Sequence, residues 1–139
     1  IFFYIFYLYL GFDIKPSIYL FLLPIVILQL CILSLGLGIL ISSLTTKYRD
    51  LTFALGFIIQ LWLYATPIVF PLSLVSEEYR FYLILNPLTS IVEFFKLSFF
   101  GVSSITATDF LISFCISIIV FLLGLITFNK MEKTFMDTI

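Results

Sequence analysis

The chain has 139 residues, of which 63% are hydrophobic and only 11% are charged, with a formal net charge of −1. Because soluble domains are about 25% charged, this composition excludes an ordinary water-soluble domain and predicts an all-α integral membrane protein. The near-neutral charge gives no indication of a nucleic-acid partner.

The first two predicted elements are apolar helices with a short polar turn between them. Residues 1–12 carry no charge but are too few to cross a bilayer, so we interpret them as the end of a truncated span. Residues 18–44 also carry no charge, and as a helix they would extend about 40 Å. The hydrocarbon layer is about 30 Å thick, so 18–44 is predicted to be a full transmembrane helix.

A short charged loop, "TTKYRD" at 45–50, comes between this helix and the next uncharged run, 51–70. The run 51–70 is predicted to be a second full transmembrane helix, about 30 Å long. Pro67 lies near its end, where it lacks an N–H and clashes with the preceding turn. We therefore expect a kink at Thr66-Pro67.

The region 71–109 is predicted to hold two short helices, neither of which is long enough to cross the bilayer. Ser76, followed by two acidic residues, suits the start of the first helix. Asn86-Pro87 should end it, because the residue before a proline avoids α geometry.

The second short helix is predicted to start at Ser90, which has capping-box spacing with Glu93, and to stop at Gly101. Such a pair either lies along the membrane surface or re-enters the membrane. Backbone of this kind is tolerated at membrane depth only where protein or a water-filled cavity surrounds it. A re-entrant pair would therefore indicate a pathway.

The last predicted elements are a transmembrane helix over 110–128 and a tail over 129–139. If 71–109 returns to its own side, the 45–50 loop and the tail share one membrane face. The cations of that face are closely spaced: Lys47, Arg49, Lys130 and Lys133. Those of the opposite face are more scattered: Lys15, Arg80 and Lys96. Since cytoplasmic loops are enriched in Lys and Arg, we predict that the loop and the C-terminus are cytoplasmic.

Four classes of activity lack the residues that they need. No GxxxxGK[ST] loop occurs, so the chain has no evident means of binding ATP. The chain has no His, and Cys31 and Cys115 have no metal-binding spacing, so we expect no metal or cofactor in it. The predicted full spans contain no Asp, Glu, Lys or Arg, which argues against an ion-coupled carrier. An intramembrane enzyme acting on lipid-linked sugars would need carboxylates at the membrane boundary or a DxD-like metal-binding pair, and we find neither.

Small residues recur in the 18–44 helix, where Ser34, Gly38 and Ser42 are four apart and Gly36 lies between them. Small side chains allow another helix to approach closely. The partner is either a helix of the same chain or a second copy of the chain, and the pattern leaves both interpretations open. Gln29 is predicted to form an interhelical hydrogen bond, as is Gln60.

Aromatic and charged residues in the second half have two interpretations each. Trp62 and Tyr64 are typical of an interfacial aromatic belt, but they lie several residues before the end of their run and could instead stack on sugars along a path. Glu93 and Lys96, three residues apart on a helix, can form an ion pair. The pair is either solvated at the surface or held within a re-entrant segment.

Taken in order, these residues resemble the permease subunit of ABC exporters of bacterial surface polysaccharides, of the ABC-2 type. The resemblance extends over nearly the whole chain and rests on an ordered set of residues: Gly36 and Gly38, Tyr48-Arg49-Asp50, Gln60, Thr66-Pro67, Asn86-Pro87, Glu93, Gly101 and, in the tail, Glu132, Phe135 and Asp137. Lys96 departs from the pattern, because the family often has Arg there.

The resemblance implies the C-terminal half of a multi-pass permease in the bacterial inner or plasma membrane. It implies a homodimer of permeases with two copies of a separate ATPase, which binds ATP and Mg²⁺. The cargo would be an O-antigen-like glycan, a teichoic-acid-type polymer or another lipid-linked glycan. The loop that contacts the ATPase would comprise Lys47, Tyr48, Arg49 and Asp50. The substrate path and its outer gate would involve Gln60, Trp62, Tyr64, Thr66, Pro67, Asn86, Pro87, Glu93 and Lys96.

Two alternatives stay open on the sequence. An ABC-type permease for a drug or a lipid would keep the fold and change the cargo. A structural subunit of a membrane complex would use the small-residue face for assembly and have no transport path.

Overall fold

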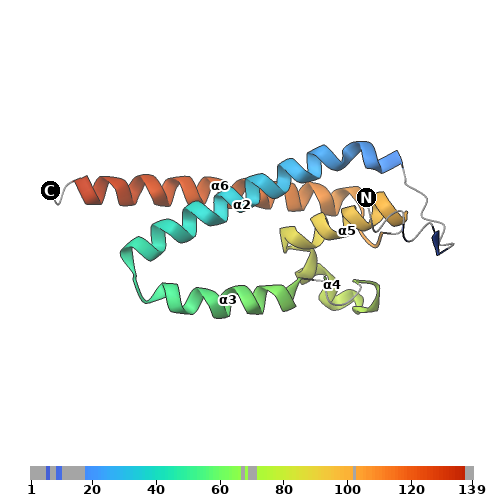
Figure 1. The fold of residues 1–139 in the computed structure, drawn as a ribbon, viewed down its shortest axis with the longest axis horizontal. Helices are drawn as coiled ribbons and strands as arrows, with labels where there is room; N and C mark the ends of the chain where they lie inside the picture. The colour runs from blue at the N-terminus through green and yellow to red at the C-terminus, as the bar shows by residue number, and fades with distance from the viewer. Residues whose placement is uncertain are drawn as a thin grey trace.

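The computed structural model describes residues 6, 9, 10, 18–66, 68, 72–101 and 103–136, and all regular structure within them is helical (Figure 1). The prediction of an all-α fold is thereby confirmed for the described residues. The elements in chain order are η1 (Ile18–Leu22), α2 (Leu23–Lys47), α3 (Leu51–Ala65), η2 (Leu72–Leu74), α4 (Glu77–Ile84), α5 (Pro87–Phe100) and α6 (Ala107–Met136). Most of the predicted span end, 1–12, lies outside the described residues.

Within the residues that the structure describes, two helical stretches are long and apolar enough to cross a membrane. One joins η1 to α2 and has 30 residues, and the other covers 27 residues of α6. They run in the same direction and cross each other, as Figure 1 shows. Helices of this length extend about 40–45 Å, which exceeds the hydrocarbon thickness of about 30 Å.

Helix α6 starts before the predicted 110–128 span and continues beyond it, so most of the predicted tail is helical. Its start is stabilised by a reciprocal contact. The N–H of Thr106 donates to the Asp109 carboxylate at 2.8 Å, and the N–H of Asp109 donates to the Thr106 hydroxyl at 3.4 Å. This exchange satisfies two backbone donors, as in a capping box.

Helix α3 has 15 residues and ends at Ala65, well before the predicted end of the 51–70 run. The predicted kink at Thr66-Pro67 is wrong, because the helix stops there. Thr66 is extended, with φ −104° and ψ 134°, as expected for a residue that precedes a proline. Pro67 itself lies outside the described residues. At about 22 Å, α3 alone is shorter than the hydrocarbon layer.

Helices α4 and α5 form a pair bent by 95° at the break between them, in agreement with the two predicted short helices. Ser76 is the N-cap of α4, and Gly101 ends α5 in the left-handed conformation with φ 69°. The predicted start of α5 at Ser90 is wrong. Asn86 is the N-cap, because its side chain accepts from the N–H of Leu88 and Pro87 takes the first helical position.

The buried part of the molecule is largely polar. Among the described residues, nine buried residues are polar or charged and five are apolar, whereas large apolar side chains are exposed along every long helix. In water this distribution would be unfavourable. It suits a lipid environment, in which apolar side chains face hydrocarbon and polar groups pair inside the protein.

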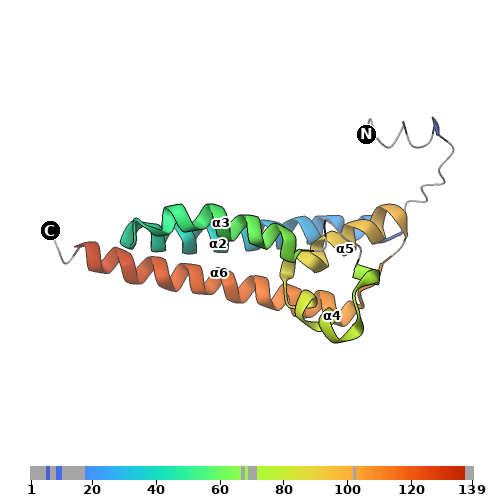
Figure 2. The same cartoon turned by 90° about the horizontal axis from the view of Figure 1, so that it is seen from below.

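The tightest packing occurs where α2 crosses α6. A Cβ at Gly36 would lie 2.6 Å from the Cα of Phe121, and a Cβ at Gly124 would lie 2.6 Å from the carbonyl oxygen of Gly36. A small apolar core lies beside this crossing and includes Val26 and Leu33 of α2. In the view of Figure 2, α2, α3 and α6 lie lengthwise, while α4 projects away from them.

Candidate functional site

The connection between α2 and α3 consists of the exposed residues 48–50 and follows Lys47, the last residue of α2. The Lys47 ammonium lies 5.2 Å from the centre of the Tyr48 ring. The first turn of α3 is bonded to the connection, since the N–H of Leu51 donates to the Tyr48 carbonyl and the N–H of Phe53 donates to the Asp50 carbonyl. The loop predicted to contact an ATPase is therefore short, charged and exposed.

A hydrogen-bonded group joins the end of α3 to the start of α5, and Asn86 is at its centre. The indole N–H of Trp62 donates to Asn86 Oδ1 at 3.3 Å. Asn86 Nδ2 donates to Thr66 Oγ1 at 3.0 Å and to the Ala65 carbonyl at 3.4 Å. Asn86 Oδ1 also accepts from the N–H of Leu88 at 3.2 Å. The fold thus brings together residues that are about 20 positions apart in the sequence.

The ion pair between Glu93 and Lys96 links α5 to the loop before α6. Lys96 Nζ lies 2.7 Å from Glu93 Oε1, and Glu93 Oε2 accepts from the N–H of Ser104 at 3.3 Å. The Glu93 side chain is 4% exposed and that of Lys96 is 36% exposed. The interpretation as a solvated surface pair therefore fails for Glu93, whose carboxylate is enclosed by the protein.

A second polar group joins α2 to α5 and α6. Gln29 Nε2 donates to Ser113 Oγ at 2.8 Å, and Ser113 Oγ donates to the Pro87 carbonyl at 3.1 Å. The predicted interhelical hydrogen bond of Gln29 is confirmed. Its partner Ser113 was not predicted, although Ser113 and Ser117, four residues apart in an apolar helix, could have indicated a polar stripe. Three buried polar groups in the described part have no hydrogen-bond partner: Gln29 Oε1, Thr89 Oγ1 and Ser90 Oγ.

Other predicted site residues do not join these groups. Gln60 and Tyr64 are exposed on α3. They are four residues apart and share a face, whereas Trp62 lies about 200° around the helix from either of them.

The small residues of α2 also separate by face. Gly36 is buried against α6, while Ser34, Gly38 and Ser42 are exposed. The exposed three form a row with spacing four on one side of the helix. Whether a second copy of the chain covers this row stays a prediction.

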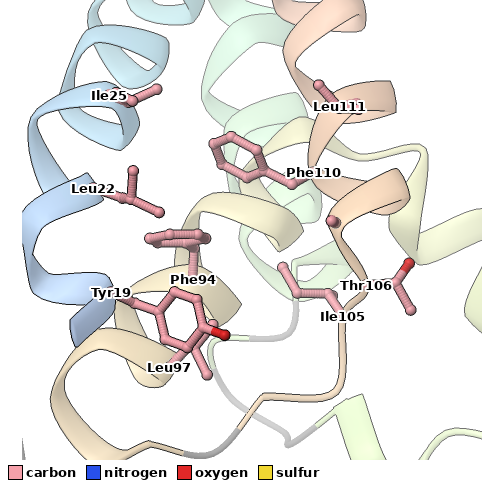
Figure 3. Close-up of a pocket in the computed structure, with 10 residues that line it drawn as sticks. Tyr19, Leu22, Ile25, Phe94, Leu97, Ile105, Thr106, Phe110 and Leu111 are labelled. Carbon is pink, nitrogen blue, oxygen red and sulfur yellow. The ribbon is translucent and has the colours of Figure 1, made fainter. Parts of the chain in front are cut away.

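An apolar pocket of about 410 Å³ lies between η1, α2, α5 and α6 (Figure 3). The Tyr19 and Phe94 rings meet edge to face with their centroids 6.4 Å apart, and the centroids of Phe94 and Phe110 are 5.1 Å apart. None of the described residues that line the pocket carries a charged side chain. It can pack against an apolar chain but offers few hydrogen bonds to a sugar.

The chemistry available to these groups is hydrogen bonding between helices. The part of the chain that the structure describes contains no cluster of three or more His, Cys, Asp or Glu side chains that could hold a metal ion. The Asn86, Glu93 and Gln29 groups each connect segments that are distant in the sequence. Together they link α2, α3, α5 and α6 by hydrogen bonds.

Comparison with known proteins identifies relatives for most of the chain. The family model described as "ABC-2 type transporter" matches residues 1–100. Over 87 residues, the chain is 29% identical to the O-antigen export system permease protein RfbA of Myxococcus xanthus. These 87 residues cover 61% of this chain and 34% of the relative. Over 134 residues, it is 27% identical to a protein of the same name from Klebsiella pneumoniae, with 91% and 49% covered.

A second Klebsiella pneumoniae protein of that name is 26% identical over 115 residues, which cover 83% of this chain and 44% of the relative. The chain thus spans about a third to a half of the length of these curated relatives. No solved structure matches it significantly.

Proposed function

Because the chain belongs to the ABC-2 type transporter family, we propose that it forms the membrane-spanning permease part of an ATP-driven exporter of surface polysaccharide or lipid-linked glycan. The observation that carries this proposal is the family match over residues 1–100, together with relatives named as O-antigen export permeases. The exposed apolar helices support a place in the bacterial inner or plasma membrane.

We propose that a separate ATPase, present in two copies, binds ATP and Mg²⁺ and drives export. It contacts the permease at Lys47, Tyr48, Arg49 and Asp50, on the cytoplasmic side. The shortness and exposure of this connection support the assignment. The C-terminal end of α6 lies at the same end of the molecule in both views, and it adds Lys130 and Lys133 to the positive charge there (Figures 1 and 2). Positive charge favours a cytoplasmic location.

The bent pair α4–α5 is proposed to act as a gate on the outer side, and a second permease copy completes the path. The pair is bent by 95° at its break. If it enters the membrane, protein or a water-filled cavity must surround it, which would suit a gate. The residues proposed for the path or gate are Gln60, Trp62, Tyr64, Thr66, Pro67, Asn86, Pro87, Glu93 and Lys96. The exposed row of Ser34, Gly38 and Ser42 is available as part of a seam between the two copies.

The experiment uses the full-length protein, with Cys31 and Cys115 replaced by Ala and a candidate ATPase co-expressed. We expect Arg49→Cys to cross-link to the ATPase with a yield that changes when ATP is added. Thr106→Cys, which is exposed at the opposite end of α6, is the matched control and should not cross-link. In parallel, the protein should restore surface glycan in a strain that lacks its own permease.

Two results would contradict the proposal. One is the absence of a cross-link from Arg49→Cys while the ATPase is bound elsewhere. The other is normal expression and membrane insertion without any restored glycan on the surface.

A further inference from the structure

The hydrogen bonds of Asn86 connect α3 to the break between α4 and α5, and α3 has few other attachments. No residue of α3 is buried, and an apolar groove of about 450 Å³ lies between it and α2. Among the described residues, the side-chain hydrogen bonds that leave α3 and its C-cap Thr66 all involve Asn86. The hydrogen bonding between α3 and α5 therefore depends on this one side chain.

The opposite end of α3 is attached to the connection 48–50 through backbone hydrogen bonds to its first turn. Between these two ends lie the 15 residues of α3, without a proline or a break. A helix of this kind moves as a unit. A displacement of the connection would therefore be carried along α3 to Ala65.

We propose that Asn86 is a positioning residue that fastens the start of α5 to the end of α3, so that α5 follows when α3 is displaced. The inference rests on the proposed function for the source of the motion, which is the ATPase at the connection 48–50. It assigns Trp62, Thr66 and Asn86 to contacts within the protein rather than to contacts with the glycan.

Asn86 has two roles that can be separated by substitution. Its Oδ1 caps α5 by accepting from the N–H of Leu88, while its Nδ2 reaches across to Thr66. Replacing Asn86 itself would disturb the cap, which contributes to the stability of α5. Replacing Thr66 with a residue that lacks a hydroxyl leaves the cap intact and removes the nearer of the two acceptors on the α3 side, while the Ala65 carbonyl stays at 3.4 Å. The test is therefore best made at Thr66.

The matched variants are Thr66→Val, which keeps the shape and loses the hydroxyl, and Thr66→Ser, which keeps the hydroxyl. Thr66 Oγ1 also donates to the Trp62 carbonyl within its own segment, at 3.0 Å. Thr127→Val controls for that second loss, because Thr127 Oγ1 donates only to the carbonyl of Leu123 in its own helix, at 2.8 Å. Trp62→Phe removes the indole donor and provides an independent break of the same link.

The first readout is the distance distribution between spin labels on α3 and α5 in the full-length protein, reconstituted in lipid and measured by pulsed electron paramagnetic resonance. Labels at Phe57→Cys and Phe100→Cys use exposed positions, after Cys31 and Cys115 are replaced by Ala. We expect a narrow distribution in the parent protein, in Thr66→Ser and in Thr127→Val. Thr66→Val and Trp62→Phe should broaden it.

The second readout is the amount of glycan exported per ATP hydrolysed when the ATPase is present. The net effect of one lost hydrogen bond corresponds to a factor of about five in an equilibrium. Thr66→Val should therefore lower the ratio of export to hydrolysis roughly fivefold while the ATPase still binds and hydrolyses ATP. Thr66→Ser keeps the hydroxyl and should therefore keep the ratio of the parent protein. If Thr66→Val lowered the ratio only by making the protein unstable, the hydroxyl of Thr66→Ser would not be expected to prevent the loss.

The outcomes separate this inference from the proposed function. If Thr66→Val leaves the label distances unchanged, or if Thr127→Val broadens them equally, the inference is overturned. An unchanged ratio of export to hydrolysis in Thr66→Val overturns it as well. If no ATPase binds the parent protein but the distances broaden as expected, the proposed function fails and the link between α3 and α5 stands.

Discussion

Glu93 shows how one residue can connect two segments in the interior of this protein. Its carboxylate accepts from Lys96 on the same helix and from the N–H of Ser104 in the loop before α6. An ionised carboxylate out of water is favourable only when it is paired and hydrogen-bonded. Lys96 differs because its side chain is about a third exposed and can reach a polar surrounding. The enclosed Glu93 carboxylate therefore needs the Lys96 ammonium as a partner more than the ammonium needs the carboxylate.

We predict that Lys96→Met lowers the free energy of unfolding by about 1–3 kcal/mol, because it leaves the enclosed carboxylate without its cation. Glu93→Gln should cost less, since the amide oxygen can still accept from the N–H of Ser104. The measurement is reversible denaturation of the full-length protein in mixed micelles. If both variants lowered the free energy of unfolding equally, or if Glu93→Gln lowered it more, enclosure of the Glu93 carboxylate would not be the reason why the ion pair stabilises the protein.

At the scale of elements, the crossing of α2 and α6 depends on backbones that touch at two glycines. Gly36 and Gly124 face each other, and neither site has room for a Cβ beside the neighbouring backbone. Gly38 belongs to the same predicted small-residue pattern, yet nothing lies within 4 Å of a Cβ placed there. The difference arises because two residues along a helix correspond to about 200° of rotation.

Gly36→Ala and Gly124→Ala are each expected to destabilise the protein by about 1–3 kcal/mol, because the added methyl must push two backbones apart. Gly38→Ala is the matched control and should be neutral or stabilising by up to about 1 kcal/mol, through the higher helix propensity of alanine. The same denaturation measurement compares them. The close crossing would be refuted if Gly36→Ala and Gly38→Ala were equally stable. A loss of assembly in Gly38→Ala alone would instead place a second subunit on the exposed row.

For the whole molecule, the main consequence of the fold is that segments distant in the sequence lie at the same end. The connection 48–50 and the C-terminal end of α6 lie together, and the start of α6 lies at the other end with the end of α5 (Figures 1 and 2). This arrangement results from α2 and α6 running in the same direction while α3 returns beside them. If α2 and α6 both cross the bilayer, one face of the membrane carries the cations of both segments.

We therefore expect Arg49→Cys and Lys133→Cys to lie on the same, inner face of right-side-out vesicles. Both should react with a membrane-impermeant maleimide only after the membrane is permeabilised. Thr106→Cys should react without permeabilisation, because it precedes the first residue of α6 at the other end. All three variants carry Ala in place of Cys31 and Cys115. Labelling of Arg49→Cys and Lys133→Cys from opposite faces would contradict the arrangement of α2 and α6.

Local sequence signals predicted several elements well. The uncharged runs indicated the long helices, and Asn86-Pro87 and Gly101 marked the end of α4 and the end of α5. Two errors came from competing local signals. Near Ser90, the Asn86-Pro87 signal for a helix start was stronger than the capping-box pattern of Ser90 and Glu93. At Thr66, the preference of a residue before proline for extended geometry ended the helix instead of bending it.

The sequence alone determined that the chain is helical and suited to lipid, because composition and the length of uncharged runs decide which solvent a segment prefers. Only the tertiary structure decided that Asn86 meets Trp62 and Thr66, that Gln29 meets Ser113, and that Gly36 rather than Gly38 touches α6. Each of these contacts depends on how the helices rotate and cross. The rotation and crossing of the helices are set by packing between segments distant in the sequence, and a local sequence pattern does not predict that packing.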